Sequence, residues 1–126
     1  MSKRFVHTST HTTKSALILQ LSYILVMYNS AKVTLKELSE KTGVSASTLS
    51  RIKNGYEGGH SLDSVLRLAD AIDLEYRVVT ERVDGVTTNH TYVEPATDYC
   101  KRKGLAVVPV NRVPKAVLKQ VVAQLH

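Results

Sequence analysis

One short stretch, residues 34–55, constrains the fold more than any other part of the chain, because helix start and stop signals follow each other closely in it. Thr34 and Glu37 have the Ser/Thr-x-x-Glu spacing of a capping box, in which each side chain satisfies a free amide at the start of a helix. Gly43 can adopt the left-handed conformation that ends a helix, and Ser45 can cap the next helix. The stretch therefore predicts two capped helices joined by a three-residue turn and stopped by a glycine.

The apolar residues of this stretch predict which sides of the two helices face inward. Leu49 and Ile52 lie three positions apart, so they share one face of the second helix. The predicted inward residues are Leu38, Val44, Leu49 and Ile52. The residues left on the other faces of the second helix are Ala46, Ser47, Ser50, Arg51 and Asn54. Residues 45–54 include no acidic side chain, and both of their charges are positive, which suits a surface that meets a polyanion.

The same stretch resembles the Cro/repressor-like, or Xre, family of helix-turn-helix transcription factors, and the resemblance covers about residues 14–74. It is carried by Leu38, Ser39, Gly43, Val44, Ser45, Thr48, Leu49, Ile52 and Gly55. The resemblance implies a mainly α-helical, lambda-repressor-like core, which in this chain is followed by a β-hairpin and short C-terminal helices. It also implies binding of double-stranded DNA, with the first turns of the second helix in the major groove.

The resemblance also implies roles for individual residues. Base edges are expected to be read by Ser45, Ala46, Ser47 and Arg51. Phosphate contacts or docking are predicted for Thr34, Lys36, Thr48, Ser50, Lys53 and Asn54. Leu35 stands where relatives often have a phosphate-binding glutamine, so Lys36 is expected to supply that anchor, and Lys53 stands where many relatives have glutamate.

The chemistry of the outward residues agrees with these roles. Arg51 has a planar fork that can bind guanine O6 and N7 together, an arrangement worth about 1–3 kcal/mol of base discrimination. Ala46 offers a methyl group for apolar contact with thymine, and the hydroxyls of Ser45 and Ser47 can bond either a phosphate or a base. The alternative is an ordinary helical hairpin in which Arg51 is a solvated surface residue.

Composition fits one small domain with an excess of positive charge. The chain has 126 residues, with 17 basic against 11 acidic side chains and a formal net charge of +6. Its single cysteine, Cys100, excludes an intramolecular disulfide framework and fits a reducing compartment, so we expect a cytoplasmic protein. The histidines lack metal-ligand spacing and no glycine-rich phosphate loop is present, so the sequence predicts no cofactor, no metal and no enzymatic activity.

The N-terminal region divides into a polar arm and an apolar helix. Residues 1–12 show no hydrophobic period and predict a flexible basic arm, of the kind that can follow the minor groove. Residues 16–28 are apolar except for Gln20 and Ser22, and they are too few to span a bilayer, which predicts a helix buried nearly all round. The far face of that helix needs cover from the C-terminal half or from a second subunit.

Ser61 is predicted to cap a further helix that ends near residue 73, in which Leu62, Val65, Leu66, Ala69 and Ile72 keep helical spacing.

After residue 74 the periodicity changes from helical to extended. Residues 75–83 are rich in β-formers, and Asp84 followed by Gly85 is a strong two-residue hairpin turn. The predicted cross-strand pairs are Val83 with Val86, Arg77 with Tyr92, and Tyr76 with Val93, with Arg77 stacked on Tyr92. Further elements are predicted as a helix over residues 95–104, a strand over residues 105–110 and a last helix from Pro114.

These features divide the chain into a flexible arm (residues 1–12), a helix-turn-helix domain (residues 13–74) and a hairpin and helical region (residues 75–126). We expect the last region to build a homodimer, because two recognition helices related by a twofold axis can read a palindromic operator. The predicted function is a sequence-specific transcriptional regulator, in its simplest form a bacterial or phage repressor associated with the nucleoid. Two alternatives stay open: an antitoxin that binds a toxin through residues 75–126, and an inhibitor of a host protein that kept the helix-turn-helix fold.

Overall fold

The structure, a computed structural model, describes residues 6–8 and 13–105. Its elements in chain order are β1 (Val6–Thr8), α1 (Thr13–Ser30), α2 (Leu35–Thr42), α3 (Ala46–Lys53), α4 (Leu62–Ala71), β2 (Tyr76–Val83), β3 (Val86–Val93) and α5 (Ala96–Arg102). The predicted fold class, a helix-turn-helix core with a β-hairpin extension, is confirmed. The predicted strand over residues 105–110 and the helix from Pro114 fall almost wholly outside the described residues.

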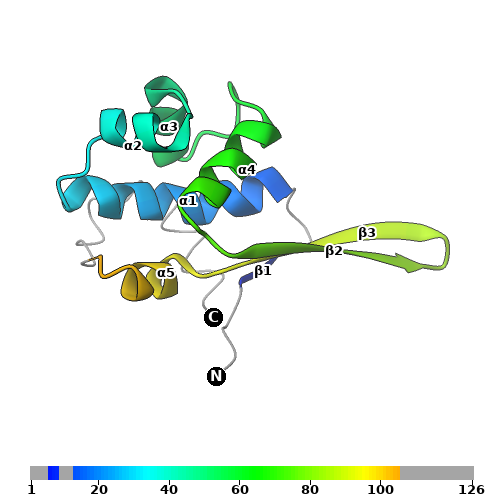
Figure 1. The fold of residues 1–126 in the computed structure, drawn as a ribbon. Coiled ribbons are helices and arrows are strands. Elements are labelled where there is room, and N and C mark those ends of the chain that lie inside the picture. Colours follow the sequence, from blue (N-terminus) through cyan, green and yellow to red (C-terminus); the bar gives the residue numbers. More distant parts are fainter. Residues whose placement is uncertain (1–5, 9–12, 106–126) are drawn as a thin grey trace.

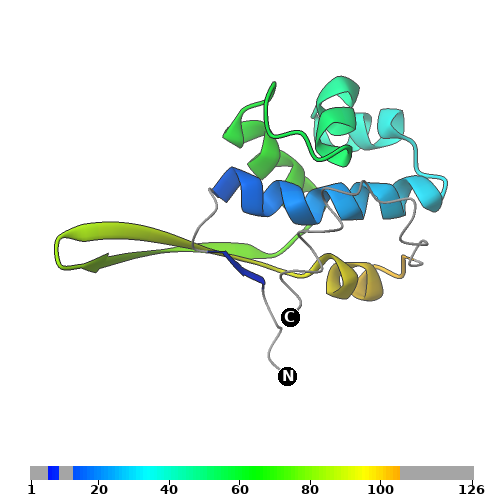
Figure 2. The same cartoon turned by 180° about the vertical axis from the view of Figure 1, so that it is seen from behind.

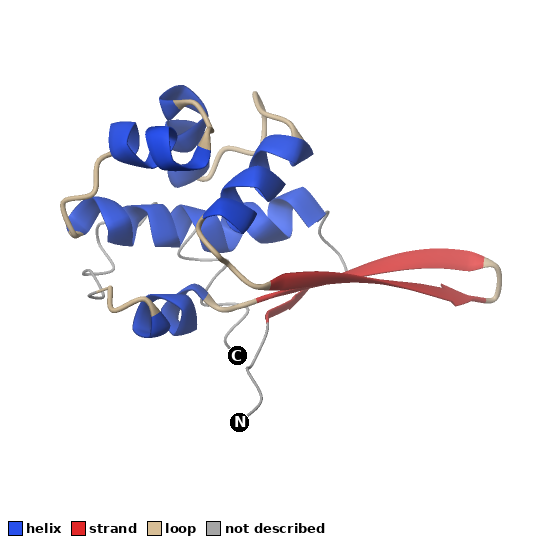
Figure 3. Ribbon diagram, viewed as in Figure 1, coloured by secondary structure: helices blue, strands red, loops and turns tan. Residues whose placement is uncertain are grey.

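Helix α1 lies at the centre of the molecule. Figure 1 and the reverse view in Figure 2 show α2, α3 and α4 along one side of α1, and α5 and β1 along the opposite side. In Figure 3 the two long strands project from this helical body as a ribbon. The arrangement places the helix-turn-helix and the sheet on different sides of α1.

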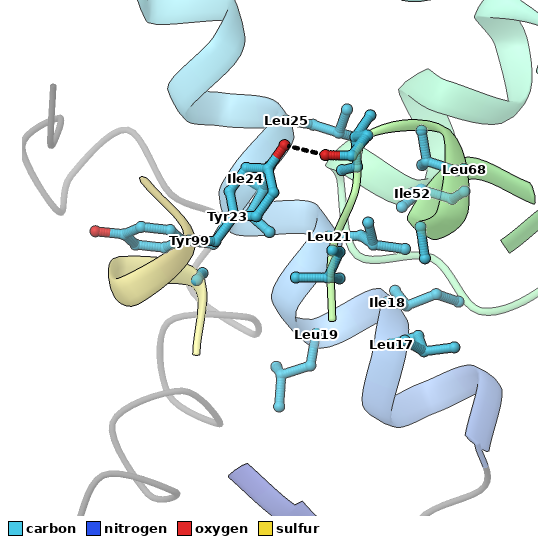
Figure 4. Close-up of a cluster of buried hydrophobic side chains, with 14 of the residues drawn as sticks. Leu17, Ile18, Leu19, Leu21, Tyr23, Ile24, Leu25, Ile52, Leu68 and Tyr99 are labelled. Carbon is cyan, nitrogen blue, oxygen red and sulfur yellow. Dashed lines mark hydrogen bonds between the residues drawn. The ribbon is translucent and has the colours of Figure 1, made fainter. Parts of the chain in front are cut away.

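Side chains around α1 form most of the hydrophobic core. Residues 16–27 are all buried, so the predicted all-round burial of this helix is confirmed. The four inward residues predicted for α2, the turn and α3 are also buried, and Figure 4 shows Ile52 and Leu68 packed against α1. The far face of α1 is covered by α5 and β3 of the same chain. It is therefore not open to a second subunit.

The helix starts follow the predicted local signals. The Oγ1 of Thr34 accepts a hydrogen bond from the Glu37 amide at 3.1 Å, and the Ser61 side chain accepts one from the Ser64 amide at 3.2 Å. The second half of the capping box differs from the prediction, because the Glu37 carboxylate accepts a bond from the Thr34 hydroxyl at 3.3 Å. The hydroxyl therefore serves both as an acceptor for the helix and as a donor to the carboxylate.

In α4 the inward face differs from the predicted pattern at Leu62, which is exposed, at Leu66, which is half-buried, and at Leu68, which was not predicted to be buried. Leu62 is the first residue of the helix and is 41% exposed, whereas Leu68 is fully buried. Val65 and Ala69 are buried with Leu68, as positions three and four apart on a helix should be. The core-facing stripe of α4 thus begins one turn later than its first leucine.

The hairpin has the predicted register along its whole length. Val83 pairs with Val86, and the ladder continues to Tyr76 opposite Val93. The two turn residues, Asp84 and Gly85, have φ angles of 53° and 79°, as a two-residue turn that follows the strand twist requires. Only the base of the hairpin packs on the helices: Val93 is buried, whereas the residues of β2 after Tyr76 are exposed.

Residues 6–8, which the sequence places in a flexible arm, form the short strand β1. They pair antiparallel with residues 91–93 of β3, so the sheet order is β1-β3-β2. The prediction of an arm without regular structure is wrong for these three residues. A strand this short shows no period of its own and depends on pairing with a segment far along the chain. The rest of the predicted arm lies outside the described residues, as does any contact that it makes with the minor groove.

Helix α5 is fixed to the body by buried polar contacts. The Gln20 Oε1 accepts a 2.9 Å hydrogen bond from the Ala96 amide, so a side chain of α1 satisfies the first amide of α5. The buried carboxylate of Glu94 accepts bonds from Nε and Nη2 of Arg102, each at 2.7 Å. These bonds raise the pKa of the Arg102 guanidinium above its usual range. The pair closes the end of α5 over the end of β3.

Within the described part of the chain, no single helix is long and apolar enough to cross a membrane, and α1 with α2 passes such a test only as a pair bent by 120°.

Candidate nucleic-acid interface

The turn between α2 and α3 is fastened by a buried threonine that the sequence analysis did not single out. The Thr42 hydroxyl donates to the Leu38 carbonyl at 2.7 Å and accepts from the Val44 amide at 3.2 Å. Gly43 follows with a φ of 77° and donates to the Ser39 carbonyl, which ends α2 as predicted. The sequence signal was present, since a small hydroxyl side chain directly before a C-cap glycine can bond both sides of the turn. Thr42 thus fixes the angle at which α3 leaves the turn.

The structure brings the four predicted base-reading residues onto the exposed start and outer side of α3. The side chains of Ser45, Ala46, Ser47 and Arg51 are all exposed. No acidic residue lies within α3, and its last turn has the two positive charges of Arg51 and Lys53. This face can approach an anionic surface without meeting a like charge.

Ser45 already has an internal task as the N-cap of α3. Its Oγ accepts a hydrogen bond from the Thr48 amide at 3.2 Å and donates to the Thr48 Oγ1 at 2.9 Å. The hydroxyl proton of Ser45 is therefore used inside the protein. The hydroxyl proton of Thr48 can then turn outward, which suits the phosphate contact predicted for that residue.

Arg51 is exposed, yet its head group is held by the loop between α3 and α4. Its Nη1 donates a 2.8 Å hydrogen bond to the carbonyl oxygen of Gly59. Gly59 has a φ of 84°, and a Cβ on it would lie 3.0 Å from the same nitrogen. The remaining N–H groups of the guanidinium stay free of this bond and can serve a base edge.

The predicted phosphate and docking residues lie on two helices. Thr34 and Lys36 lie at the start of α2, and both are exposed. On α3 and its cap lie Thr48, Ser50, Lys53 and Asn54. The Lys53 carbonyl accepts a 2.5 Å hydrogen bond from the Ser22 hydroxyl of α1, so a buried serine anchors the end of α3 to the core.

His60 directly follows Gly59 in the loop between α3 and α4 and was not among the predicted site residues. Both ring nitrogens are buried, and within residues 6–8 and 13–105 neither has a hydrogen-bond partner. Lys14 donates to the His60 carbonyl at 3.2 Å. Burial lowers the pKa of the imidazole below 6.5, and the nearby charges of Lys14 and Arg51 lower it further. The loop that holds Arg51 therefore favours the neutral form of its own His60 ring.

The second basic cluster of the chain, residues 101–103, has a structural role in two of its members. Arg102 is paired with Glu94, and the Lys103 Nζ lies 3.3 Å from the Asp73 carboxylate. These residues lie in and after α5, on the other side of α1 from α3. Among the residues that the structure describes, no group of three or more His, Cys, Asp or Glu is arranged to hold a metal ion.

A comparison with protein families agrees with this geometry. Residues 27–79 match the family model described as helix-turn-helix, which covers the end of α1, all of α2, α3 and α4, and the first half of β2. Searches of curated proteins and of solved structures gave no match.

Proposed function

Residues 27–79 belong to the Cro/C1-type, Xre-like helix-turn-helix family of DNA-binding transcriptional regulators, and from this premise we propose that the chain is a sequence-specific repressor that binds a palindromic operator as a homodimer. The proposed place of action is the nucleoid in the cytoplasm of a bacterial or phage-infected cell.

The observation that carries this proposal is the exposed, acid-free face of α3. Its start is capped by Ser45, its end is anchored to α1 by Ser22, and its outer side bears Arg51. A recognition helix must be rigid, because base edges are read by hydrogen bonds with narrow geometry. Here both ends of α3 are fixed, by the Ser45 cap at its start and by the Ser22 bond to the Lys53 carbonyl at its end. Of the predicted base-reading residues, only Ser45 takes part in these bonds.

The small size of one recognition helix supports the homodimer part of the proposal. One recognition helix reads only a few base pairs, and two such helices related by a twofold axis read half-sites about 34–36 Å apart. Occupying such a site blocks access of other proteins to the promoter. We assign the dimer to residues 75–126, because the far face of α1 is already covered within the chain.

The test is selection of bound fragments from random duplex DNA by the full chain. We expect a palindromic consensus for the wild type. Arg51→Ala should weaken binding by about 1–3 kcal/mol for each half-site of the selected operator and relax the preference at one base of each half-site. Lys101→Ala is the matched control, since this exposed lysine lies on α5, and it should leave the consensus unchanged.

Two results would overturn the proposal. A wild-type chain that shows no preference among duplexes at physiological salt has no operator. A regulator whose activity in cells survives Arg51→Ala without change acts instead through a protein partner, as an inhibitor that kept the helix-turn-helix fold would.

A further inference from the structure

The outer edge of β2 is open along the whole strand. In the sheet order β1-β3-β2, β2 is the last strand, and no other segment of the described ranges pairs with it. Seven of its eight residues are exposed. Native edge strands are usually protected by charged side chains, by a proline, by a bulge or by a very short length. The sequence Tyr-Arg-Val-Val-Thr-Glu-Arg-Val contains no proline, and its register with β3 is continuous. Its only protection is the charge of Arg77, Glu81 and Arg82, which have both signs.

The direction of the backbone groups along this edge can be worked out from the hairpin. The Glu94 amide donates to the Glu75 carbonyl at 2.9 Å, so this pair is a hydrogen-bonded pair of the ladder. Hydrogen-bonded pairs recur at every second position of an antiparallel ladder. The odd-numbered residues of β2 therefore direct their backbone groups toward β3. The even-numbered residues, from Tyr76 to Arg82, direct theirs toward the open edge.

We propose that a second copy of this chain pairs with that edge, β2 against β2, antiparallel, with Val79 opposite Val79 of the partner subunit. The inference deepens the homodimer part of the proposed function by naming the interface and its register. It does not require that the protein bind DNA.

Charge complementarity selects this register. The hydrogen-bonding pattern requires even-numbered residues to face even-numbered residues, so one strand can slide past the other only in steps of two residues. Each such step moves the centre of the symmetric pairing by one residue. Centring on Val79 places Arg77 opposite the partner's Glu81, and by symmetry this pair occurs twice. Centring on Glu81 would place two glutamates directly opposite each other, and centring on Thr80 would place Glu81 opposite the partner's Val79. The Val79 register alone pairs every charge on this face of β2 with its opposite.

The side chains that this register brings together are already extended along the sheet. Arg77 lies over the Tyr92 ring at 4.8 Å, and Glu81 is 3.1 Å from the His90 Nε2. Val79, between them on the same face, is 42% exposed in the single chain and would pack against the partner's Val79. On the opposite face, the partner's Arg82 would reach Tyr76, whose hydroxyl donates to the Asp70 carboxylate at 3.1 Å.

The symmetry of this pairing also suits two recognition helices. A twofold axis at Val79 runs perpendicular to the sheet, so each face of the sheet continues into the same face of the partner's sheet. Thr91 and Val93 are buried on the face that packs on α1, and α3 lies on the far side of α1. Both copies of α3 would thus lie on one side of the joined sheet. The two Tyr76 residues would be about 20 Å apart along it, with the helical bodies farther out.

The first experiment measures mass in solution by sedimentation without DNA. We expect the wild type, with a chain mass of 13.9 kDa, to sediment as a dimer at micromolar concentration. Arg77→Glu and Glu81→Arg should each raise the dimer dissociation constant at least about ten-fold, because two attractive pairs become two repulsive ones. The double variant restores opposite charges in both pairs and should return the constant to within about three-fold of the wild type.

The second experiment reads the register directly and does not depend on how the charge variants fold. Val79→Cys should form a disulfide-linked dimer on mild oxidation, since facing residues of a non-hydrogen-bonded pair have Cβ atoms close enough for a bridge. Val86→Cys is the matched control: Val86 is 63% exposed but lies on β3, so it should not cross-link. Cys100 should not form a cross-link, because it is buried and burial raises the pKa of its thiol to about 11.

The outcomes separate this inference from the proposed function. A wild type that is monomeric with and without DNA, or a dimer in which Val79→Cys does not cross-link, overturns the β2 interface. A double charge variant that remains as dissociated as the single variants overturns the register. Operator binding by a protein with either result would still support the regulator, whereas a cross-linking dimer that selects no DNA would support the interface alone.

Discussion

Arg51 is bonded to the carbonyl oxygen of Gly59, eight residues further along the chain, so the loop after α3 controls the side chain best suited to read a base. Gly59 is adapted to this task in two ways: it has a positive φ, and it leaves room for the guanidinium that a side chain would fill. The loop and the helix must therefore be considered together when the specificity of α3 is altered.

Gly59→Ala should both destabilise the protein and displace Arg51. A residue with a Cβ at a φ of 84° costs about 1–2 kcal/mol, and that Cβ would lie 3.0 Å from the Arg51 Nη1. Chemical denaturation checks the stability, and binding of the selected operator checks the side chain. Gly58→Ala is the control, since nothing lies within 4 Å of a Cβ at that position. Equal effects of both substitutions would contradict the assigned role of Gly59.

His60 should make the protein less stable as the pH falls below 6.5. Burial, and then the charges of Lys14 and Arg51, lower the pKa of the folded imidazole. The unfolded chain therefore takes up the proton more readily, and the stability present above pH 6.5 is lost as the pH falls toward the folded pKa. Urea unfolding between pH 7.5 and 5.5 should show this loss for the wild type and a flatter profile for His60→Leu. If His60→Leu loses stability with falling pH as steeply as the wild type does, another group causes that loss. His90→Gln serves as the control variant.

Breaking the buried pair of Glu94 and Arg102 should be among the most damaging single changes. The Glu94 side chain is 1% exposed, and Arg102→Ala would remove the two 2.7 Å charge-assisted hydrogen bonds that the guanidinium donates to this buried carboxylate. The expected cost is about 3–5 kcal/mol. Lys103→Ala removes a pair with Asp73, which is 73% exposed, and should cost no more than about 1 kcal/mol. Thermal and chemical unfolding of the two variants measure the difference, and similar losses in both would refute the distinction.

Tyr99 should make the fold sensitive to alkali. Its hydroxyl donates to the Ile72 carbonyl at 2.7 Å and lies 2.5 Å from the Tyr28 hydroxyl. Burial, and then the bond with Tyr28, raise the pKa of Tyr99 well above 10. Stability that is present below pH 10 is then lost above it, because the unfolded tyrosine ionises first.

Unfolding measured from pH 9 to 11.5 should therefore give a steeper loss for the wild type than for Tyr99→Phe. That variant should also cost about 1–3 kcal/mol at neutral pH, since the buried Ile72 carbonyl loses its donor. Tyr56→Phe changes an exposed ring and should reproduce the wild-type profile. A Tyr99→Phe profile as steep as the wild type would contradict the role given to this hydroxyl.

The parts of the fold that the sequence predicted are those set by neighbours along the chain. Thr34, Ser45 and Ser61 cap helices because each needs only an amide three residues ahead. The hairpin register is fixed by Asp84 and Gly85, since a two-residue turn leaves one alignment of the strands. The stacking of Arg77 on Tyr92 follows from that register and is confirmed.

The features that the sequence did not predict depend on residues far apart in the chain. The third strand of the sheet is formed by residues 6–8, which pair with residues 91–93. Neither segment contains a sequence pattern that predicts this pairing. Gln20 interrupts an apolar run in the sequence, yet its side chain accepts a hydrogen bond from the Ala96 amide 76 residues later. For the candidate site, the outward residues of α3 could be assigned from helical spacing. The bond from Arg51 to Gly59 could not, because it depends on the path of a loop.

The bond from Gln20 to the first amide of α5 has a consequence for engineering. The family model matches residues 27–79, which lack most of the central helix α1. They also lack β3 and α5, which pack on the other side of α1, and the bond between Gln20 and Ala96. A chimaera that transplants only those residues onto a foreign dimerising module would leave behind the scaffold on which they rest. Swapping specificities between such regulators should therefore exchange the outer side chains of α3 and keep the remainder of the host protein.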